Sequence, residues 1–322
     1  MQILFCVGKS YVPIHRKMAD QLEAMGAHVR CLMYDQALDK ELIKKSIRDC
    51  EVCITAIAPC DREVIEAAPN LRYILKTGTG LDNVAISDAT DRGILVSNAP
   101  GGNATSVAEM AFGQMISLSR MIPMLDRGTK KAEWPSGEAY ELDGKTVGII
   151  GFGSIGQKVA QFAGGFTMRV LAFGNYQDQD AASRLHATFV DLDRLLREAD
   201  YIVISTALSS SNYHLIDQHA IDKMKTTAFL VNISRGALID EQVLLDALKK
   251  KRLAGAALDV FEQEPPESLP DLDNLIVSPH VAGTTRESIA RVARVTVENV
   301  RKFMNHEQPD FVVNTEALRQ NQ

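Results

Sequence analysis

Three clusters of polar side chains that could perform acid/base chemistry follow predicted strands in the second half of the chain. They supply a fixed cation in Arg235, a carboxylate in Glu264 and an imidazole in His280. An arginine suits a substrate carboxylate because its planar fork donates two hydrogen bonds and its charge does not titrate away. A histidine can give or take the proton that accompanies hydride transfer at a carbonyl, and a nearby carboxylate would hold its ring. The alternatives are purely structural roles: a surface arginine that caps a helix, a solvated glutamate in an acidic turn and a histidine in the core.

A glycine-rich stretch earlier in the chain predicts a dinucleotide site. Gly151-Phe-Gly153-Ser-Ile-Gly156 follows the apolar run Val147–Ile150 and opens a helical pattern over Lys158–Phe166. In this context the first glycine permits a tight turn, the second lets the backbone approach a pyrophosphate, and the third lets helix and strand pack closely. The exposed N-terminus of the helix also attracts negative charge.

Strands and helices that would position these residues alternate along the whole chain. This alternation predicts an α/β protein with two doubly wound parallel sheets, Rossmann-like or flavodoxin-like, and ligands bind such sheets at the carboxyl ends of the strands. The expected strands are Ile3–Val7, Val29–Met33, Val52–Ile57, Tyr73–Lys76, Ile94–Ser97, Val147–Ile150, Arg169–Phe173, Tyr201–Thr206, Ala228–Asn232, Ala256–Val260 and Leu275–Ser278.

Two domains are expected, because 322 residues exceed the usual single-core domain. The breaker cluster Asn98–Gly102 marks the first boundary. No further strand follows the long helical pattern after residue 285, so this helix is expected to return to the first domain. The prediction is a discontinuous domain of residues 1–98 plus 285–322, hinged to a central domain of residues 99–284.

Composition excludes several classes of protein. A net charge of −6 argues against nucleic-acid binding, and no apolar run approaches a transmembrane span. The N-terminal stretch is typical of a first strand and not of a signal peptide. All five cysteines fall in the first sixty residues, and this odd number of reduced thiols indicates a cytoplasmic protein.

No metal site is expected. Cys50 and Cys53 form a single C-x-x-C without a second pair, so ordinary thiols are favoured over zinc or a redox role. The histidines other than His280 lack metal spacing and are expected to be solvated. The aperiodic segment Lys130–Gly144, with the single tryptophan, is expected to be a surface excursion or a subunit contact.

Five motifs resemble those of the NAD(P)-dependent D-isomer-specific 2-hydroxyacid dehydrogenases, nearest the phosphoglycerate dehydrogenase-like branch. The resemblance runs from about Val52 to Met304. Its most specific pieces are Thr77-Gly-Thr-Gly-Leu-Asp-Asn83, Gly151-x-Gly-x-x-Gly156, Val231-Asn-Ile-Ser-Arg-Gly236, Ala257-Leu-Asp-Val-Phe-Glu-Gln-Glu-Pro265 and Ser278-Pro-His-Val-Ala-Gly283.

The resemblance implies a role for each matched residue. His280 becomes the acid/base, Glu264 its partner, and Arg235 the group that binds the substrate carboxylate and polarises the carbonyl. The amides of Thr79 and Gly80 would hold the same carboxylate. The family's central domain, which binds the cofactor, usually forms a homodimer. The implied cofactor contacts are Thr79, Gly151, Gly153, Ser154, Ile155, Gly156, Gly174, Asn175, Thr206, Ile233, Asp259, His280 and Gly283.

One departure from the family pattern bears on the choice of cofactor. The position where NAD-preferring members place an acidic residue is Gly174 here, and Asn175 follows it. A missing carboxylate removes repulsion against a 2′-phosphate, which permits NADP. No Arg or Lys follows at once to bind that phosphate, and Asp178 and Asp180 would oppose it. The cofactor is therefore NAD or NADP, with NAD favoured.

A second departure bears on the substrate. Where phosphoglycerate dehydrogenases have an arginine for the substrate phosphate, this chain has Thr55. Without the arginine, a substrate phosphate would lack a charge-assisted hydrogen bond that contributes about 1.5–3 kcal/mol. A small unphosphorylated 2-keto acid is therefore expected, as for a glyoxylate or hydroxypyruvate reductase, although Lys76, Arg62 or Arg72 offers another cation. The alternatives are a D-3-phosphoglycerate dehydrogenase without a regulatory domain and, from another class, a nucleotide-sensing corepressor-like binding protein.

Overall fold

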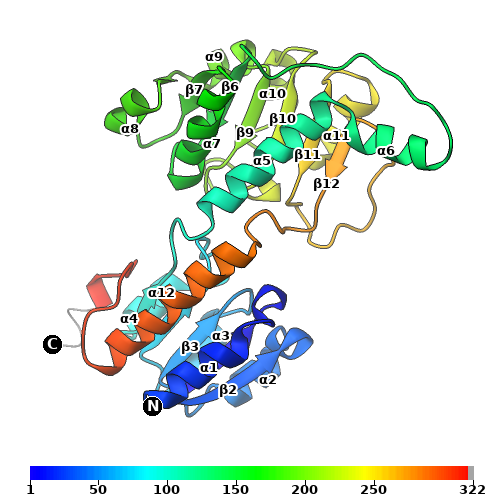
Figure 1. Ribbon diagram of the computed structural model, residues 1–322. Helices are drawn as coiled ribbons and strands as arrows, with labels where there is room; N and C mark the ends of the chain where they lie inside the picture. Colours follow the sequence, from blue (N-terminus) through cyan, green and yellow to red (C-terminus); the bar gives the residue numbers. More distant parts are fainter. Residues whose placement is uncertain (318–322) are drawn as a thin grey trace. The chain divides into compact units, whose positions relative to one another are not determined.

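The computed structural model describes residues 1–317 and forms two compact units. Unit 1 combines Met1–Asn103 with the described chain from Thr284 onward, and unit 2 is Ala104–Gly283. Both units are built around a parallel sheet with helices (Figure 1). The two parallel-sheet α/β domains that the alternating pattern predicts are confirmed.

Unit 1 holds a five-stranded sheet in the order β2-β1-β3-β4-β5. Its strands are β1 (Gln2–Val7), β2 (His28–Met33), β3 (Val52–Thr55), β4 (Tyr73–Lys76) and β5 (Leu95–Ser97). Its helices are α1 (His15–Ala24), α2 (Lys40–Ser46), α3 (Arg62–Glu66), α4 (Ile86–Asp91) and α12 (Arg286–Met304), with 3-10 turns η1 (Lys9–Tyr11) and η2 (Tyr34–Ala37). Strand β3 ends two residues earlier than the apolar run predicts, because Ala56 and Ile57 already belong to the following loop.

Helix α12 packs into the core of unit 1. Thr285 caps its N-terminus by accepting a hydrogen bond from the Ser288 amide at 3.1 Å. Val292 and Val300 are buried in one cluster with Phe5 of β1. Burial of one such large apolar side chain stabilises the fold by about 1.5–3 kcal/mol. The chain therefore leaves unit 1 near Asn103 and rejoins it through this helix.

Unit 2 holds a seven-stranded sheet in the order β12-β11-β10-β9-β6-β7-β8. Its strands are β6 (Thr146–Ile150), β7 (Arg169–Phe173), β8 (Ala187–Phe189), β9 (Tyr201–Ile204), β10 (Phe229–Asn232), β11 (Gly255–Leu258) and β12 (Leu275–Val277). Its helices are α5 (Ala104–Ser119), α6 (Ile122–Lys130), α7 (Ser154–Gly165), α8 (Gln179–Arg184), α9 (Leu192–Glu198), α10 (Gln218–Lys223) and α11 (Glu241–Lys249), with the 3-10 turn η3 (Gly236–Leu238). The edge strand β8 was not expected, because its three partly exposed residues form no apolar run.

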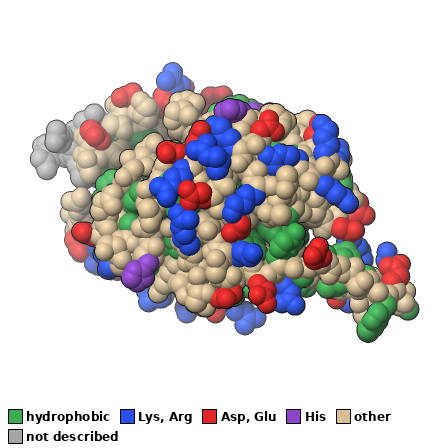
Figure 2. Space-filling view, turned by 90° about the horizontal axis from the view of Figure 1, so that it is seen from above, with side chains coloured by type: hydrophobic (Ala, Val, Ile, Leu, Met, Phe, Trp, Pro, Cys, Tyr) green, Lys and Arg blue, Asp and Glu red, His purple; other side chains and the backbone are tan. Residues whose placement is uncertain are grey.

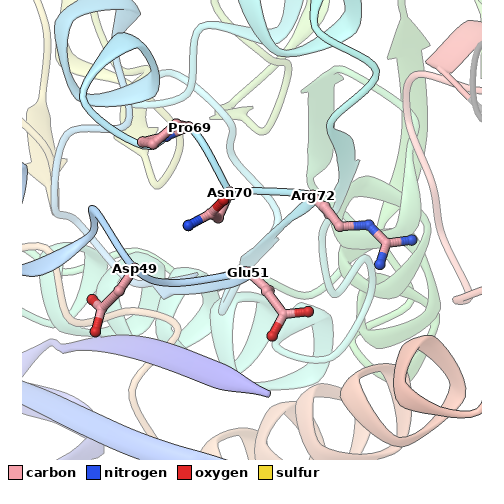
Figure 3. A pocket seen from close by; sticks show the side chains of 5 residues that line it. All are labelled: Asp49, Glu51, Pro69, Asn70 and Arg72. Carbon is pink, nitrogen blue, oxygen red and sulfur yellow. The ribbon is translucent and has the colours of Figure 1, made fainter.

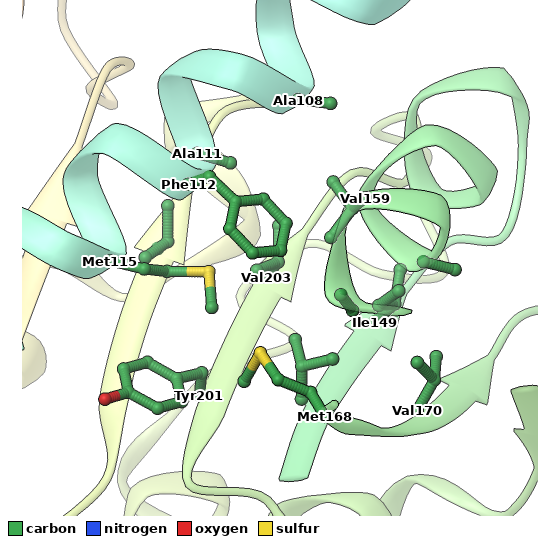
Figure 4. Packing of buried hydrophobic residues seen from close by; sticks show 14 of the residues in the cluster. Ala108, Ala111, Phe112, Met115, Ile149, Val159, Met168, Val170, Tyr201 and Val203 are labelled. Atoms are coloured by element: carbon green, nitrogen blue, oxygen red, sulfur yellow. The ribbon is translucent and has the colours of Figure 1, made fainter. Parts of the chain in front are cut away.

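Alternate residues of the central strands of unit 2 pack into two separate cores. Ile149 of β6 and Val203 of β9 join a cluster with Phe112 of α5, whereas Ile150 and Ile202 belong to a second cluster. Figure 4 shows Ala111, Phe112 and Met115 of α5 beside Tyr201 and Val203 in the first cluster. Burial on both faces explains why these strands read as continuous apolar runs.

The segment between α6 and β6 runs over the surface with little regular structure, and Trp134 within it is 90% exposed. On the face shown in Figure 2, Lys and Arg side chains are interspersed with Asp and Glu side chains. Within the part of the chain that is described, no helix is both long and apolar enough to span a bilayer.

All five cysteines are free, and four of them are buried in unit 1. Burial, aided by the charge of Asp49, raises the pKa of Cys50 to about 12. Hydrogen bonds with Cys6 and Cys60, together with burial, raise the pKa of Cys53 well above its usual value. The Cys53 and Cys60 sulfurs lie 3.8 Å apart. The thiols of Cys50 and Cys53 are therefore protonated and unreactive at neutral pH, as expected of ordinary core cysteines.

Candidate active site

The glycine-rich loop joins β6 to α7, beside the point where the strand order of unit 2 reverses. Open α/β sheets bind dinucleotides at such a switch point. Gly151 has a φ of +98°, and a Cβ on Gly156 would overlap the Gly151 carbonyl. A Cβ on Gly153, by contrast, would meet nothing within 4 Å. The loop is therefore closed on its helix side and open at Gly153, where the amides at the start of α7 can receive a phosphate.

Hydrogen bonds tie the neighbouring strand ends to this loop. The Ser205 hydroxyl, after β9, donates to the Gly151 carbonyl at 2.7 Å. The Ser234 hydroxyl, after β10, donates to the Thr206 carbonyl. Ile233 beside it is almost fully buried. The structure thus brings Thr206 and Ile233 to the same edge of the sheet as the glycine-rich loop.

The end of β7 presents Gly174 and Asn175. A Cβ on Gly174 would meet no atom closer than 3.7 Å, so the position has room for a side chain. Asp178 does not face solvent freely, because its carboxylate caps α8 by accepting from the Ala181 amide at 2.9 Å. The same carboxylate accepts from Gln157 Nε2 at 3.5 Å.

His280 and Glu264 form a hydrogen-bonded pair. His280 Nδ1 lies 2.8 Å from Glu264 Oε2, and the other carboxylate oxygen accepts from the Phe261 amide at 3.2 Å. The side chains are 50% and 39% exposed. Because the carboxylate accepts from Nδ1–H, it fixes the ring orientation and leaves Nε2 as the nitrogen that can exchange a proton with a ligand.

Asp259 holds the loop that carries His280. Its carbonyl accepts from the His280 amide at 2.7 Å, and its carboxylate accepts from the amides of Val281 at 3.0 Å and Ala282 at 2.9 Å. His280 has a φ of +52°, a left-handed conformation that costs roughly 1–3 kcal/mol for a residue other than glycine. The carboxylate of Asp259 is almost fully buried, and these donors compensate its charge. The hydrogen bonds of Asp259 therefore stabilise the left-handed backbone conformation of His280.

Arg235 lies in a turn that packs directly against the Glu264 loop. Asn232 Nδ2 donates to the Arg235 carbonyl at 2.9 Å, and Asn232 Oδ1 accepts from the Ser234 amide at 3.1 Å. A Cβ on Gly236 would overlap the backbone of Phe261. Only glycine permits this approach, which brings the turn after β10 against the loop after β11. Arg235, Glu264 and His280 thus follow three adjacent strands at one edge of the sheet.

Comparison with known proteins identifies the family of the chain. A family model described as D-isomer specific 2-hydroxyacid dehydrogenase, NAD binding domain, matches residues 112–282. The glyoxylate reductase of Korarchaeum cryptofilum is 36% identical over 290 residues, 87% of each chain. The chain belongs to the D-isomer-specific 2-hydroxyacid dehydrogenase family. It is an NAD(P)-dependent oxidoreductase that acts on CH–OH groups, and the family that the five motifs indicate is confirmed.

Solved structures resemble this dehydrogenase along almost its whole length. A glyoxylate reductase from Paecilomyes thermophila is 27% identical with a TM-score of 0.85, covering 97% of this chain and 98% of that one. The apo-structure of D-lactate dehydrogenase from Escherichia coli is 29% identical with a TM-score of 0.82, covering 97% and 100%.

One cluster of polar side chains in the dehydrogenase, around His214, was missed by sequence reasoning. His214 Nε2 lies 2.8 Å from Glu262 Oε1, and His214 Nδ1 lies 3.8 Å from Asp240 Oδ2. The expectation of a solvated His214 is therefore wrong. The three groups lie close enough for a metal, and the two carboxylates lie beside different nitrogens of the His214 ring. Nothing in the spacing of these residues predicts that they meet.

In unit 1 of the dehydrogenase, Thr79 and Gly80 lie in the loop after β4. Asn98 Nδ2 donates to the Thr79 carbonyl at 2.7 Å and so supports this loop. Thr55, at the end of the adjacent strand β3, is fully buried, and its hydroxyl donates to the Ala58 carbonyl at 2.9 Å. Lys76 donates to the Ala56 carbonyl and to Asn83 Oδ1, the latter at 2.6 Å.

A shallow hollow of about 420 Å³ lies at the opposite edge of the unit 1 sheet (Figure 3). Glu51 and Arg72, which line it, directly precede β3 and β4. Asp49 in its wall is paired with Arg30 at 3.0 Å, and Arg72 stacks over the ring of Phe303. The hollow is therefore away from the strand ends at which such sheets bind ligands, and its charges already have partners.

Proposed function

We propose that this dehydrogenase reduces a small unphosphorylated 2-keto acid of the glyoxylate and hydroxypyruvate class to the D-2-hydroxy acid, with NADH as the favoured cofactor. The observation that carries the proposal is the His280–Glu264 pair, which lies at the strand edge that also carries Arg235 and the glycine-rich loop. A nicotinamide cofactor held at the glycine-rich loop Gly151–Gly156 would supply the hydride for C2 of the keto acid. Protein side chains must supply the proton and bind the acid.

His280 donates its Nε2 proton to the carbonyl oxygen as the C–H bond forms, and in the reverse direction the same nitrogen removes the hydroxyl proton. Glu264 holds the ring through Nδ1 and stabilises the imidazolium before transfer. Arg235 binds the substrate carboxylate and polarises the adjacent carbonyl. Thr79 and Gly80 remain the predicted partners of that carboxylate from unit 1.

Two contacts in unit 1 support an unphosphorylated substrate. Thr55 stands where a phosphate-binding arginine is expected, and its side chain is buried and bonded to the loop. Lys76, a cation at the end of the neighbouring strand β4, donates to the Ala56 carbonyl and to Asn83 Oδ1. The curated relatives from Korarchaeum cryptofilum and Pyrococcus horikoshii, each 36% identical, are named glyoxylate reductases, which supports the same substrate class.

NAD is favoured because no Arg or Lys lies between Gly174 and Asp180, where a 2′-phosphate would need a cation.

A homodimer through unit 2 is proposed as well, since the exposed Trp134 segment offers an apolar side chain for a subunit contact. Five unpaired cysteines favour the cytoplasm.

An initial-rate matrix at 340 nm tests the proposal. NADH and NADPH are each crossed with glyoxylate, hydroxypyruvate, pyruvate, 2-ketobutyrate and 3-phosphohydroxypyruvate. Glyoxylate or hydroxypyruvate with NADH should give the highest kcat/KM. A strong preference for the phosphorylated acid would instead place the chain with D-3-phosphoglycerate dehydrogenases, and no turnover with any acid would favour a nucleotide-sensing binding protein.

The catalytic roles need variants of their own. His280→Ala should lower kcat by roughly 10²–10⁴-fold, the usual contribution of a positioned acid, while NADH binding is retained. Arg235→Lys should chiefly raise KM for the keto acid, because an ammonium cannot form the bidentate pair. Wild-type kinetics in either variant would remove that residue from the mechanism.

A further inference from the structure

Gln114 is a buried polar side chain on a helix face that is otherwise apolar. It lies on α5 among the buried residues Ala111, Met115 and Leu118, and is itself only 4% exposed. An amide in such surroundings destabilises the fold unless it is hydrogen-bonded. Its oxygen Oε1 is buried and has no hydrogen-bond partner in the described structure. The amide nitrogen therefore makes the contact that can account for this residue.

That nitrogen begins a directed chain of hydrogen bonds. Gln114 Nε2 donates to Ser278 Oγ at 3.2 Å, and Ser278 Oγ donates to Asp259 Oδ1 at 2.6 Å. The same carboxylate accepts from the amides of Val281 and Ala282, on the C-terminal side of His280. Each group donates toward Asp259, so the bonds polarise one another in the same sense.

We propose that Gln114 is a positioning residue for His280, acting through Ser278 and Asp259. The inference rests on the proposed role of His280 as the acid/base. His280 keeps its left-handed backbone only while the surrounding loop is held. Ser278 is fixed by its own amide, which donates to the Leu258 carbonyl at 2.9 Å. Gln114 orients the hydroxyl of Ser278 so that its proton points to Asp259.

Gln114→Met tests this role, because Met has a similar length and no polar atoms that need partners. We expect kcat for keto-acid reduction to fall roughly 2- to 10-fold, the effect of one neutral hydrogen bond, with KM for NADH unchanged. The melting temperature should hold or rise, since the unpartnered carbonyl is removed as well. A residue with a merely structural role would change the melting temperature and leave kcat as it is. Gln114→Leu provides a second apolar variant.

Ser119→Ala is the matched control on the same helix. The Ser119 hydroxyl is also buried, but it bonds to the Met115 carbonyl and the Tyr201 hydroxyl, each at 2.7 Å, away from the His280 loop. This variant should lose stability and keep the wild-type kcat. An equal fall of kcat in Ser119→Ala and Gln114→Met would overturn the proposal, because it would reflect general loosening of α5.

A double-mutant cycle tests the route. If Gln114 acts only through Ser278, then Gln114→Met should cause no further loss of kcat in the Ser278→Ala variant, whereas additive losses would refute the route.

His280→Ala distinguishes failure of the acid/base role of His280 from failure of the positioning role of Gln114. High activity in His280→Ala would sink the acid/base role itself. A large loss in His280→Ala beside an unchanged kcat in Gln114→Met would refute only the positioning role.

Discussion

His280 Nδ1 lies 2.8 Å from Glu264 Oε2, and this contact joins the loops that follow β12 and β11. The same loop contains a second carboxylate, Glu262, whose oxygen lies 2.8 Å from His214 Nε2. The two glutamates lie two residues apart in one loop, and each contacts a different histidine. Variants of the two glutamates can therefore separate an effect on catalysis from an effect on the structure of the loop. Only the first pair includes His280, the proposed acid/base.

Glu264→Gln should lower kcat about tenfold, because a neutral amide replaces a charge-assisted hydrogen bond that is partly screened by solvent. Glu262→Gln is its control: the same change in the same loop should reduce stability slightly and leave kcat near the wild-type value. Steady-state kinetics of both variants check this. Comparable losses in kcat would show that the whole loop, and not the His280 contact, governs the rate.

The glycine-rich loop predicts opposite outcomes for two similar substitutions. Gly153→Ala should fold with an unchanged melting temperature, because its Cβ meets nothing within 4 Å, yet weaken NADH binding roughly tenfold or more by blocking the pyrophosphate. Gly156→Ala should lower the melting temperature by several degrees, since its Cβ would overlap the Gly151 carbonyl. Calorimetry and NADH fluorescence titration measure both. Tight NADH binding by Gly153→Ala would place the pyrophosphate elsewhere.

The buried thiols should resist labelling in the native state. The pKa of Cys50 is raised to about 12, mainly by burial, so the reactive thiolate is almost absent between pH 7 and 9 and the labelling rate should stay low over this range. A thiol-titrating disulfide reagent should detect five thiols in guanidinium and at most the half-buried Cys31 in the native protein. Cys31→Ser should abolish that residual reaction. Rapid native labelling of Cys50 and Cys53 would revive a redox role for the C-x-x-C pair.

The pattern of apolar residues predicted most of the strands. A strand that is buried on both faces is a continuous apolar run, irrespective of which strands it pairs with. β4 and β7 begin and end at the expected residues. β8 was missed because a short, partly exposed edge strand has no such run. The sequence also predicted that Arg235, Glu264 and His280 lie at one edge of the sheet, because the carboxyl ends of parallel strands meet there.

Contacts between distant segments could not be predicted in this way. The pairing of His214 with Glu262 and that of Gln114 with Ser278 depend on which loops and helices meet in three dimensions. The inward turn of Thr55 toward Ala58 likewise follows from the loop and not from the residue type. Local pattern thus indicates where chemistry occurs, and tertiary packing decides which side chains support it.

Substrate choice can be tested by returning a cation to the loop after β3. Ile57 in this loop is 59% exposed, so Ile57→Arg should fold and raise kcat/KM for 3-phosphohydroxypyruvate relative to glyoxylate by about tenfold, as one solvated charge-assisted bond would. Met25→Arg is the control, because this exposed residue follows α1 near the opposite edge of the sheet. An equal response of both variants would indicate a general charge effect.

Cofactor choice can be tested at Gly174, where the backbone leaves room for a carboxylate. The nearest atom to a Cβ there is the Phe152 amide nitrogen at 3.7 Å, so Gly174→Asp should be tolerated. The new charge should accept hydrogen bonds from the adenosine ribose and repel a 2′-phosphate. We expect the ratio of kcat/KM for NADH over NADPH to rise about tenfold, which corresponds to roughly 1.4 kcal/mol. Gly164→Asp places the same charge at an open position on α7 and should leave the ratio unchanged. A ratio unaffected by Gly174→Asp would mean that the ribose does not lie at the end of β7, and the assignment of Gly174 and Asn175 as cofactor contacts would fall with it.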